Sequence, residues 1–206
     1  MILKKFVVFE GIDGAGTSTQ IKLLRERDAD KKIFFTAEPT EMPTGKFLRQ
    51  ILGGSQKASP QTTAYLFAAD RAEHLWGEGG IVDQTKNGLT VVSDRYLFSN
   101  LAYQGVTCGE DLPKMLNSPF PLPQLLFFFD ISAQKSIERV EKRGEAKEIY
   151  ENEKFLNDTA TRYRAVIDQY KKQADSGMRI VELDATLPKE KISDLIWNEI
   201  LPIINS

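Results

Sequence analysis

Five short runs of mainly apolar residues recur along the chain, and longer segments with helical periodicity separate them. The runs are Lys4–Glu10, Lys32–Ala37, Leu89–Asp94, Leu125–Asp130 and Met178–Asp184. They are apolar almost throughout and lack an alternating polar face, which is typical of strands buried on both sides in a parallel sheet. The pattern therefore predicts an α/β protein whose parallel sheet is flanked by helices.

Two of the intervening segments have clear helical signals. Ser59 is a suitable N-cap and Pro60 fits the first helical position, so a helix should run from there without a breaker as far as Gly77. Three of its residues should share one face: Phe67, Arg71 and His74. A final helix should follow Pro188 and bury one apolar stripe, namely Ile192, Leu195, Ile196 and Ile200.

Acidic residues stand at or just beyond the ends of several predicted strands. They are Glu10, Asp13, Glu38 and Asp94. In an open α/β sheet, ligands bind beyond the carboxyl ends of the strands. We therefore expect these four side chains to converge on one crevice.

Length and charge limit the classes of function. The 206 residues are 41% hydrophobic, enough for one sizeable core, so we expect a single domain over residues 1–206. With 27 basic and 29 acidic residues the net charge is -2, which favours a small-molecule partner over nucleic acid or a membrane surface. The single Cys108 cannot form an intrachain disulfide, and the first apolar run, 6–9, is too short for a signal peptide or a membrane span. We expect a cytoplasmic protein.

The stretch FEGIDGAGTSTQ, residues 9–20, nearly matches a phosphate-binding loop. Glycines at positions 11, 14 and 16 directly follow a predicted strand and allow the backbone amides to turn toward a phosphate. A helix should begin near Thr17 and add the positive end of its dipole, and Ser18 stands where the hydroxyl of such loops usually meets magnesium. The spacing predicts a phosphate site.

Thr17 departs from this pattern, which calls for lysine at its position. A charged hydrogen bond of the missing kind is worth about 1.5 to 3 kcal/mol. The loss should therefore weaken catalysis without necessarily abolishing it, and a replacement cation must come from elsewhere in the fold.

Four blocks together resemble the thymidylate kinase family over essentially the whole chain. They are FEGIDGAGTSTQ, AEPTEMPTGKFLRQIL (37–52), YLFAADRAEHL (65–75) and DRYLFSNLAYQG (94–105). The resemblance implies a three-layer P-loop kinase fold with a five-stranded parallel sheet and a helical lid at about 131–157. It also implies ATP-dependent phosphorylation of thymidine monophosphate to the diphosphate, with ATP as donor and Mg²⁺ as cofactor.

The resemblance further implies roles for the matching acceptor-site residues. Phe67 is similar to the aromatic residue on which the thymine ring stacks, and Arg71, one helical turn further on, to the donor that bonds the base. Tyr103 would pack against the deoxyribose where a 2′-hydroxyl would clash, and Gln104 would contact the base or sugar. The implied acceptor set is Asp13, Glu38, Pro39, Phe67, Arg71, Arg95, Ser99, Asn100, Tyr103 and Gln104.

By the same resemblance, several groups act on the phosphates and the metal. Arg95 would bind the acceptor phosphate, because its planar fork matches phosphate oxygens, and Asp94 would act near the magnesium. The implied donor site is Gly11, Asp13, Gly14, Ala15, Gly16, Thr17, Ser18 and Thr19, and the implied metal ligands are Ser18, Glu38 and Asp94. The implied catalytic residues are Asp13, Asp94, Arg95, Arg139 and Arg143.

Two more arginines of the family are missing. Ala37 stands where many members carry an arginine that touches the acceptor phosphate, and Ile149 stands where the lid usually carries one. A solvated, salt-bridged helix would explain Lys135, Arg139, Lys142 and Arg143, but in this context Arg139 and Arg143 are the best candidates to close over the transferring phosphate.

Two alternatives to the thymidylate kinase activity stay open. One is a kinase of the same architecture with another acceptor, such as deoxyuridine monophosphate or a deoxynucleoside. The other is a nucleotide-binding protein with little catalysis, as the three absent cations suggest. The resemblance also implies a homodimer formed through the helix at 63–75, with Tyr65, Leu66, Ala68 and Ala69 on the contact face. His74 and Cys108 receive no functional role.

Overall fold

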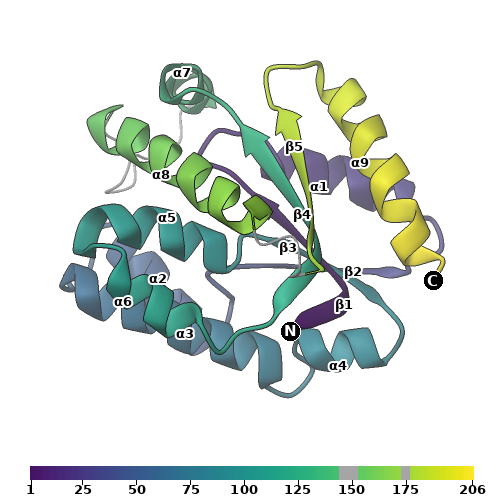
Figure 1. Ribbon diagram of the computed structural model, residues 1–206, viewed down its shortest axis with the longest axis horizontal. Coiled ribbons are helices and arrows are strands. Elements are labelled where there is room, and N and C mark those ends of the chain that lie inside the picture. The colour runs from purple at the N-terminus through teal and green to yellow at the C-terminus, as the bar shows by residue number, and fades with distance from the viewer. Residues whose placement is uncertain (144–152, 173–176) are drawn as a thin grey trace.

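A computed structural model describes residues 1–143, 153–172 and 177–206 of the chain. Its centre is one sheet of five parallel strands in the order β2-β3-β1-β4-β5 (Figure 1). The strands are β1 (Ile2–Glu10), β2 (Ile33–Ala37), β3 (Thr90–Asp94), β4 (Leu122–Asp130) and β5 (Arg179–Asp184). All five strands therefore form within a few residues of the predicted runs, and the predicted fold class is confirmed.

Helices cover both faces of the sheet and make the molecule a three-layer sandwich (Figure 1). One layer holds α1 (Thr17–Arg27) and α9 (Lys189–Ile204), which pack on each other. In the opposite layer α5 (Leu97–Cys108) packs between α3 (Pro60–Trp76) and α8 (Glu153–Lys172). The remaining described helices are α2 (Pro43–Leu52), α4 (Ile81–Lys86), α6 (Asp111–Asn117) and α7 (Ala133–Arg143).

The central strand β1 is inaccessible to solvent over its second half, because β3 and β4 flank it and helices cover both of its faces. Burial of such a run on both sides explains why its sequence lacks an alternating polar face. The chain leaves this buried strand at Glu10 and turns directly into the glycine loop. The loop is thereby anchored at the carboxyl edge of the sheet, where ligands bind in folds of this kind.

The helical predictions hold with one exception. Ser59 caps α3 by accepting a hydrogen bond from the Thr62 amide at 3.1 Å. In α9, Ile192, Ile196 and Ile200 are buried as predicted, but Leu195 is 41% exposed and the prediction for it was wrong. Ile192, Ile196 and Ile200, at positions i, i+4 and i+8, join the hydrophobic core, whereas Leu195 at i+3 lies toward solvent. Among the described residues no helix is long and apolar enough to cross a membrane.

Candidate active site

The glycine loop has the backbone geometry that the sequence predicts. Gly14 (φ 79°) and Gly16 (φ 100°) both adopt left-handed conformations, which residues with a Cβ atom avoid. A Cβ atom on Gly14 would also lie 2.8 Å from the carbonyl oxygen of Ser136. Helix α1 begins at Thr17, and no side chain caps it within the described chain. Its first amides therefore face the space beyond β1 without an intrahelical acceptor, as an anion site requires.

A cavity of about 220 Å³ opens beside this loop, between α1, α7 and the start of α9. It is lined by Ala15, Gly16, Thr19, Gln20, Phe129, Arg139, Ala185, Leu187, Lys189 and Ile192. Three of the predicted donor-site residues, Ala15, Gly16 and Thr19, thus lie on its wall. Its place next to the loop makes it the candidate site for the donor nucleotide.

Arg139 brings a positive charge to the glycine loop from α7. Its Nη2 donates to the carbonyl oxygen of Ala185 at 2.7 Å, and its Nη1 lies 3.4 Å from the carbonyl oxygens of Gly14 and Ala15. A Cβ atom on Gly16 would lie 3.9 Å from the same Nη1, so the guanidinium reaches the residue before Thr17. The predicted roles of the Arg143 side chain and of Ile149 lie outside the described residues.

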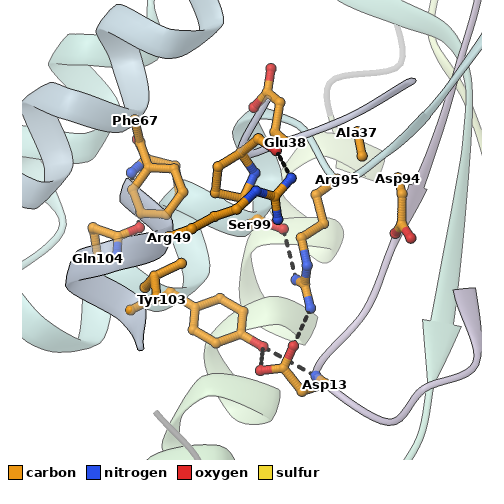
Figure 2. Close-up of a pocket in the computed structure, with 13 residues that line it drawn as sticks. Asp13, Ala37, Glu38, Arg49, Phe67, Asp94, Arg95, Ser99, Tyr103 and Gln104 are labelled. Atoms are coloured by element: carbon orange, nitrogen blue, oxygen red, sulfur yellow. Dashed lines mark hydrogen bonds and ion pairs between the residues drawn. The ribbon is translucent and has the colours of Figure 1, made fainter. Parts of the chain in front are cut away.

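A second cavity, of about 230 Å³, lies on the other side of the loop and is drawn in Figure 2. It is lined by Asp13, Ala37, Glu38, Pro39, Arg49, Leu52, Phe67, Asp94, Arg95, Ser99, Asn100, Tyr103 and Gln104. Every predicted acceptor-site residue except Arg71 is on this wall. Residues from four separate stretches of sequence thus meet at one pocket, which is the candidate site for the acceptor.

Arg95 is held at the boundary between the pocket and the loop (Figure 2). Its Nη1 donates to the Gly11 carbonyl oxygen at 3.0 Å and to Ser99 Oγ at 3.1 Å, and its Nη2 pairs with Asp13 Oδ1 at 2.5 Å. Tyr103 Oη donates to the other oxygen of Asp13 at 2.8 Å. Burial and the adjacent Asp13 carboxylate raise the pKa of Tyr103, so this hydroxyl keeps its proton and donates. The guanidinium is thereby oriented before any ligand arrives.

The opposite end of the pocket suits a flat base. Phe67 of α3 is half-buried and lines the cavity near Gln104 of α5 (Figure 2), and Asn100 of α5 lines the same cavity. The Nδ2 of Asn100 donates to Gln104 Oε1 at 2.9 Å, which holds the two amides together. An aromatic face opposite directed polar groups is the arrangement that pyrimidine recognition needs.

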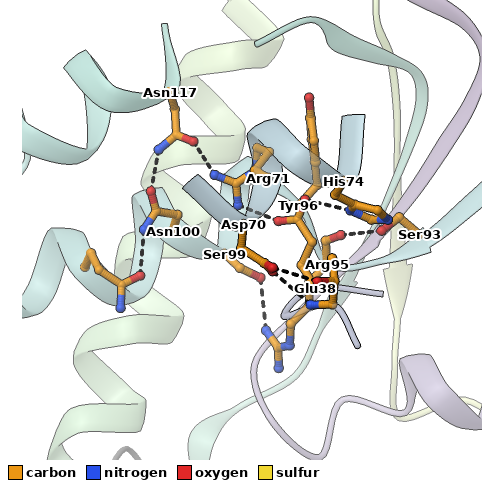
Figure 3. A network of polar contacts seen from close by, with 12 residues as sticks. Glu38, Asp70, Arg71, His74, Ser93, Arg95, Tyr96, Ser99, Asn100 and Asn117 are labelled. Carbon is orange, nitrogen blue, oxygen red and sulfur yellow. Dashed lines mark hydrogen bonds and ion pairs between the residues drawn. The ribbon is translucent and has the colours of Figure 1, made fainter. Parts of the chain in front are cut away.

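Arg71 lies behind this wall rather than on it, and only 1% of it is exposed (Figure 3). Its Nη2 pairs with Glu38 Oε2 at 2.6 Å and its Nη1 donates to Asn117 Oδ1 at 2.5 Å, while its Nε has no hydrogen-bond partner within the described chain. Asn117 in turn donates to Asn100 Oδ1 at 2.5 Å. The arginine predicted to bond the base is thus joined to the pocket wall through two asparagines.

Glu38 belongs to the same network of buried polar contacts as Arg71. Besides Arg71, it contacts Nδ1 of His74 at 3.1 Å, and Nε2 of that ring lies 2.6 Å from Thr36 Oγ1. His74, which received no role from the sequence, therefore helps to orient a predicted site carboxylate (Figure 3). Both oxygens of Glu38 have protein partners.

Ser18 and Asp94 form the part of the site that suits a divalent cation. Ser18 Oγ donates to Asp94 Oδ2 at 3.1 Å, and Asp94 Oδ1 is buried without a hydrogen-bond partner in the described chain. Hydroxyl and carboxylate oxygens are the ligands that Mg²⁺ prefers, and it usually takes only one or two from the protein. The described residues contain no cluster of three or more His, Cys, Asp and Glu side chains that could hold a metal. The oxygen atoms of Ser18 and Asp94 are of the kind that fits a magnesium ion.

One expected member of the crevice is absent from it. Asp13, Glu38 and Asp94 line the acceptor pocket, but Glu10 is fully buried beneath Ser99, and the expectation that it faces the crevice was wrong. Side chains alternate along a strand, and the turn at Gly11 moves the exposed positions on to Asp13. The position of Glu10 at the end of the strand does not by itself show whether its side chain faces the pocket or the core.

Sequence reasoning also missed Arg49 of α2, which lies across the pocket in Figure 2. Its Nη2 donates to the Pro39 carbonyl oxygen and pairs with Glu41 at 3.1 Å. Arg49 and Ala37 line both this pocket and a neighbouring cavity of about 570 Å³. A search of block 37–52 for a cation to compensate for Ala37 could have found it.

Fold and site together define a class of protein. A glycine loop between the first strand and the first helix of a parallel sheet, with an arginine-lined pocket facing it, is the architecture of P-loop phosphotransferases. The family model for thymidylate kinase matches residues 9–196, and this chain belongs to that family of phosphotransferase enzymes.

Relatives from distant organisms support the assignment to this family. One from Treponema pallidum, named for thymidylate kinase, is 39% identical over 200 residues, covering 97% of this chain and 96% of the relative. The thymidylate kinase of Leptospira interrogans is 38% identical over 170 residues, covering 79% of this chain and 81% of the relative. The solved structure of thymidylate kinase from Candida albicans aligns with a TM-score of 0.73 and 23% identity over 97% of this chain and 92% of that one, which supports the fold.

Proposed function

We propose that the protein transfers the γ-phosphoryl group of ATP to the phosphate of thymidine monophosphate, giving thymidine diphosphate and ADP. The observation that carries this proposal is the position of Arg95. Its guanidinium touches both the glycine loop, at Gly11, and the acceptor pocket, at Asp13 and Ser99. A cation at that boundary can hold an acceptor phosphate against a donor phosphate.

In this proposal the acceptor lies with its base on Phe67 and its phosphate on Arg95. Asn100 and Gln104 bound the base, and Arg71 supports them from behind the wall through Asn117, which donates to Asn100. Tyr103 and Asp13 would stand beside the sugar, where the Tyr103 ring would clash with a 2′-hydroxyl. Pro39 and Glu38 close the pocket on the side of the phosphate.

The donor phosphates lie over the amides of residues 11–19. Arg139 supplies the positive charge that Thr17 does not, because its guanidinium reaches the loop from α7. Ser18 and Asp94 would hold the magnesium ion, which supplies charge neutralisation at the donor phosphates. Glu38 stays a third predicted ligand, and Arg143 stays a predicted lid cation.

The reaction forms one bond and breaks one. A phosphate oxygen of the acceptor bonds to the γ-phosphorus, and the bond from that phosphorus to the bridging oxygen of ATP breaks, so that its electrons leave with ADP. Such a transfer needs no strong base, because the attacking oxygen already carries charge. Positioning by Arg95 and charge neutralisation by the loop and Arg139 therefore carry most of the rate.

Measurement of ADP release tests the proposal directly. With thymidine monophosphate as acceptor, ADP release should exceed that seen with a deoxynucleoside. Deoxyuridine monophosphate should be a weaker acceptor but still be phosphorylated, because the missing methyl group is worth only about 1 to 3 kcal/mol. Arg95→Ala should raise the KM for thymidine monophosphate at least tenfold, since it removes a charged contact. Absence of turnover with every monophosphate would contradict the proposal.

The functional unit in this proposal is a homodimer in the cytoplasm. Helix α3 leaves a row of apolar side chains uncovered in the described chain: Tyr65 is 53% and Trp76 is 55% exposed, and Ala69 between them is also exposed. Small residues flanked by aromatic ones let two helices approach closely. A second copy of the chain would cover this face across a two-fold axis.

A further inference from the structure

Glu10 is the most completely buried acidic side chain near the site, with no exposed surface. Its Oε1 accepts hydrogen bonds from the amides of Tyr96 at 2.8 Å and Ser99 at 3.2 Å. Its Oε2 accepts from Ser99 Oγ at 2.6 Å and Tyr163 Oη at 2.8 Å. A buried carboxylate with four donors is fully satisfied, and its surroundings are specific for an acceptor-only group.

Two of these donors belong to the start of α5. Tyr96 is the N-cap residue and Ser99 the third helical residue, and no side chain at the N-cap position satisfies their amides. The first amides of a helix lack intrahelical acceptors, so Glu10 caps α5 from a different element, the end of β1. The negative charge also lies at the positive end of the α5 dipole.

The backbone before α5 is bound to the same stretch of β1. The Arg95 amide donates to the Phe9 carbonyl oxygen at 2.9 Å, and Arg95 Nη1 donates to the Gly11 carbonyl oxygen. Arg95 has a φ of 72°, a left-handed conformation that is unfavourable for a residue other than glycine. Contacts on both sides of Glu10 therefore hold Arg95 in a backbone shape that it would not adopt by itself.

Glu10 also sets the direction of the Ser99 hydroxyl. A carboxylate can only accept, so the Ser99 hydroxyl points its proton at Glu10 and turns its lone pairs toward Arg95 Nη1, 3.1 Å away. Figure 2 shows this contact between Ser99 and Arg95 at the pocket wall. While the group at position 10 accepts the protons of both Ser99 and Tyr163, both hydroxyl oxygens are free to accept from Arg95 Nη1.

We propose that Glu10 is a positioning residue that holds Arg95 in register with the phosphate loop, by capping α5 from β1 and by directing the Ser99 hydroxyl. Glu10 touches neither substrate and acts through Ser99 and Arg95. This inference rests on the proposed function, since it takes Arg95 as the residue that binds the acceptor phosphate.

Glu10→Gln tests the inference, because it keeps the size of the side chain and changes its polarity. The single amide oxygen must face the two backbone amides, so the amide nitrogen faces Ser99 and Tyr163. Ser99 and Tyr163 then both accept from Gln, and only one of their two protons can lie between the two hydroxyls, which are 2.6 Å apart. The other proton is left facing Arg95 Nη1, which contacts both hydroxyl oxygens. Assayed above pH 8, where Glu10 of the wild type is a carboxylate, the variant should show a KM for thymidine monophosphate about tenfold higher and a kcat about tenfold lower, with the KM for ATP within twofold of wild type.

The matched control is Glu26→Gln, the same exchange at an exposed position near the end of α1. It should leave both KM values and kcat unchanged within twofold. If Glu10→Gln matches this control, or if it raises both KM values equally, the positioning role is overturned.

A double-mutant cycle shows whether Glu10 acts through Ser99. Ser99→Ala removes the hydroxyl that links Glu10 to Arg95, and it should raise the KM for the acceptor about fivefold without changing that for ATP. On this background Glu10→Gln should change the acceptor KM less than twofold further, because coupled residues give non-additive effects. A full tenfold further rise would overturn the proposal.

Ser99→Ala also decides the outcome if Glu10→Gln does not fold. It leaves the buried carboxylate and its three other donors in place, so the fold is retained, and an unchanged acceptor KM would overturn the proposal. The two hypotheses fail differently: a wild type that phosphorylates no monophosphate contradicts the proposed function, whereas an active wild type with an unaffected Glu10→Gln contradicts only this inference.

Discussion

At the scale of single residues, Arg49 is the side chain that best compensates for Ala37. Both line the acceptor pocket, and Arg49 is held there only by the Pro39 carbonyl oxygen and by an exposed ion pair with Glu41. Arg49→Ala should raise the KM for thymidine monophosphate about tenfold, because a charged contact to phosphate is worth about 1.5 to 3 kcal/mol. Steady-state kinetics with varied acceptor concentration measure the effect.

Two further variants sharpen this prediction. Lys46→Ala, an exposed residue on the same helix, should leave the KM unchanged. Ala37→Arg in the Arg49→Ala background should restore much of the lost affinity, since it returns a guanidinium to the pocket from β2. An Arg49→Ala enzyme with wild-type KM would show that the side chain only braces Pro39.

Glu10 gives a second prediction at this scale, on stability against pH. Burial raises the pKa of Glu10 to about 7, although hydrogen bonds from Ser99, Tyr163 and Tyr96 and the charge of Arg95 act to lower it. Between the ordinary value of 4.5 and about 7, the folded protein keeps the proton that the unfolded chain has lost. The free energy of unfolding should therefore fall as pH rises through this window, by on the order of 3 kcal/mol.

The comparison with Glu10→Gln isolates this contribution, because glutamine does not titrate and the other carboxylates are common to both proteins. Urea unfolding from pH 4.5 to 8 should show the stability of wild type falling relative to the variant up to about pH 7 and then staying level. A constant difference over the whole range would mean that Glu10 has an ordinary pKa.

At the scale of elements, the glycine loop and α7 share the neutralisation of the donor phosphates. Arg139 bonds Ala185 and lies against Gly14 and Ala15, so α7 delivers the charge that the loop lacks at Thr17. Thr17→Lys should then tighten ATP binding but raise turnover less than tenfold, under about 1.4 kcal/mol of barrier. Arg139→Ala should lower turnover at least a hundredfold.

Turnover at saturating substrates and ATP titrations measure both effects. Lys135→Ala is the matched control, since it removes an exposed cation from the same helix and should change turnover less than twofold. A wild type without activity that Thr17→Lys switches on would show that the loop has lost its chemistry and that α7 does not replace it.

At the scale of the whole molecule, the uncovered face of α3 predicts a dimer. Light scattering at micromolar concentration should give twice the chain mass of 23.3 kDa. Ala69→Glu should give the monomer mass, because it places a charge in the middle of the apolar row between Tyr65 and Trp76. Ala165→Glu, the same exchange at an exposed site of α8, should remain dimeric. A wild type with the mass of one chain would contradict the prediction.

The sequence predicted those parts of the protein that depend on neighbours along the chain. Apolar runs revealed all five strands, because a strand buried on both faces must be apolar at successive positions. The glycine spacing predicted the loop, since only glycine adopts the φ values of 79° and 100° without strain. Family blocks then named most of the pocket wall, and all thirteen of its lining residues fall within these blocks.

The tertiary structure alone decided which polar side chains face the pocket and which support it from behind. Glu10 and Asp13 are three residues apart, yet Glu10 caps α5 in the interior and Asp13 lines the cavity. Arg71 is buried against Glu38, whereas Arg49 lies across the pocket, and Leu195 turns away from the core that Ile196 joins.

Periodicity describes each element separately, but the direction of these side chains depends on how β1 meets α5, how α2 meets α3 and how α9 meets α1. Such contacts join residues up to about 150 positions apart, as Glu10 and Tyr163 are, and only the packed fold brings them together.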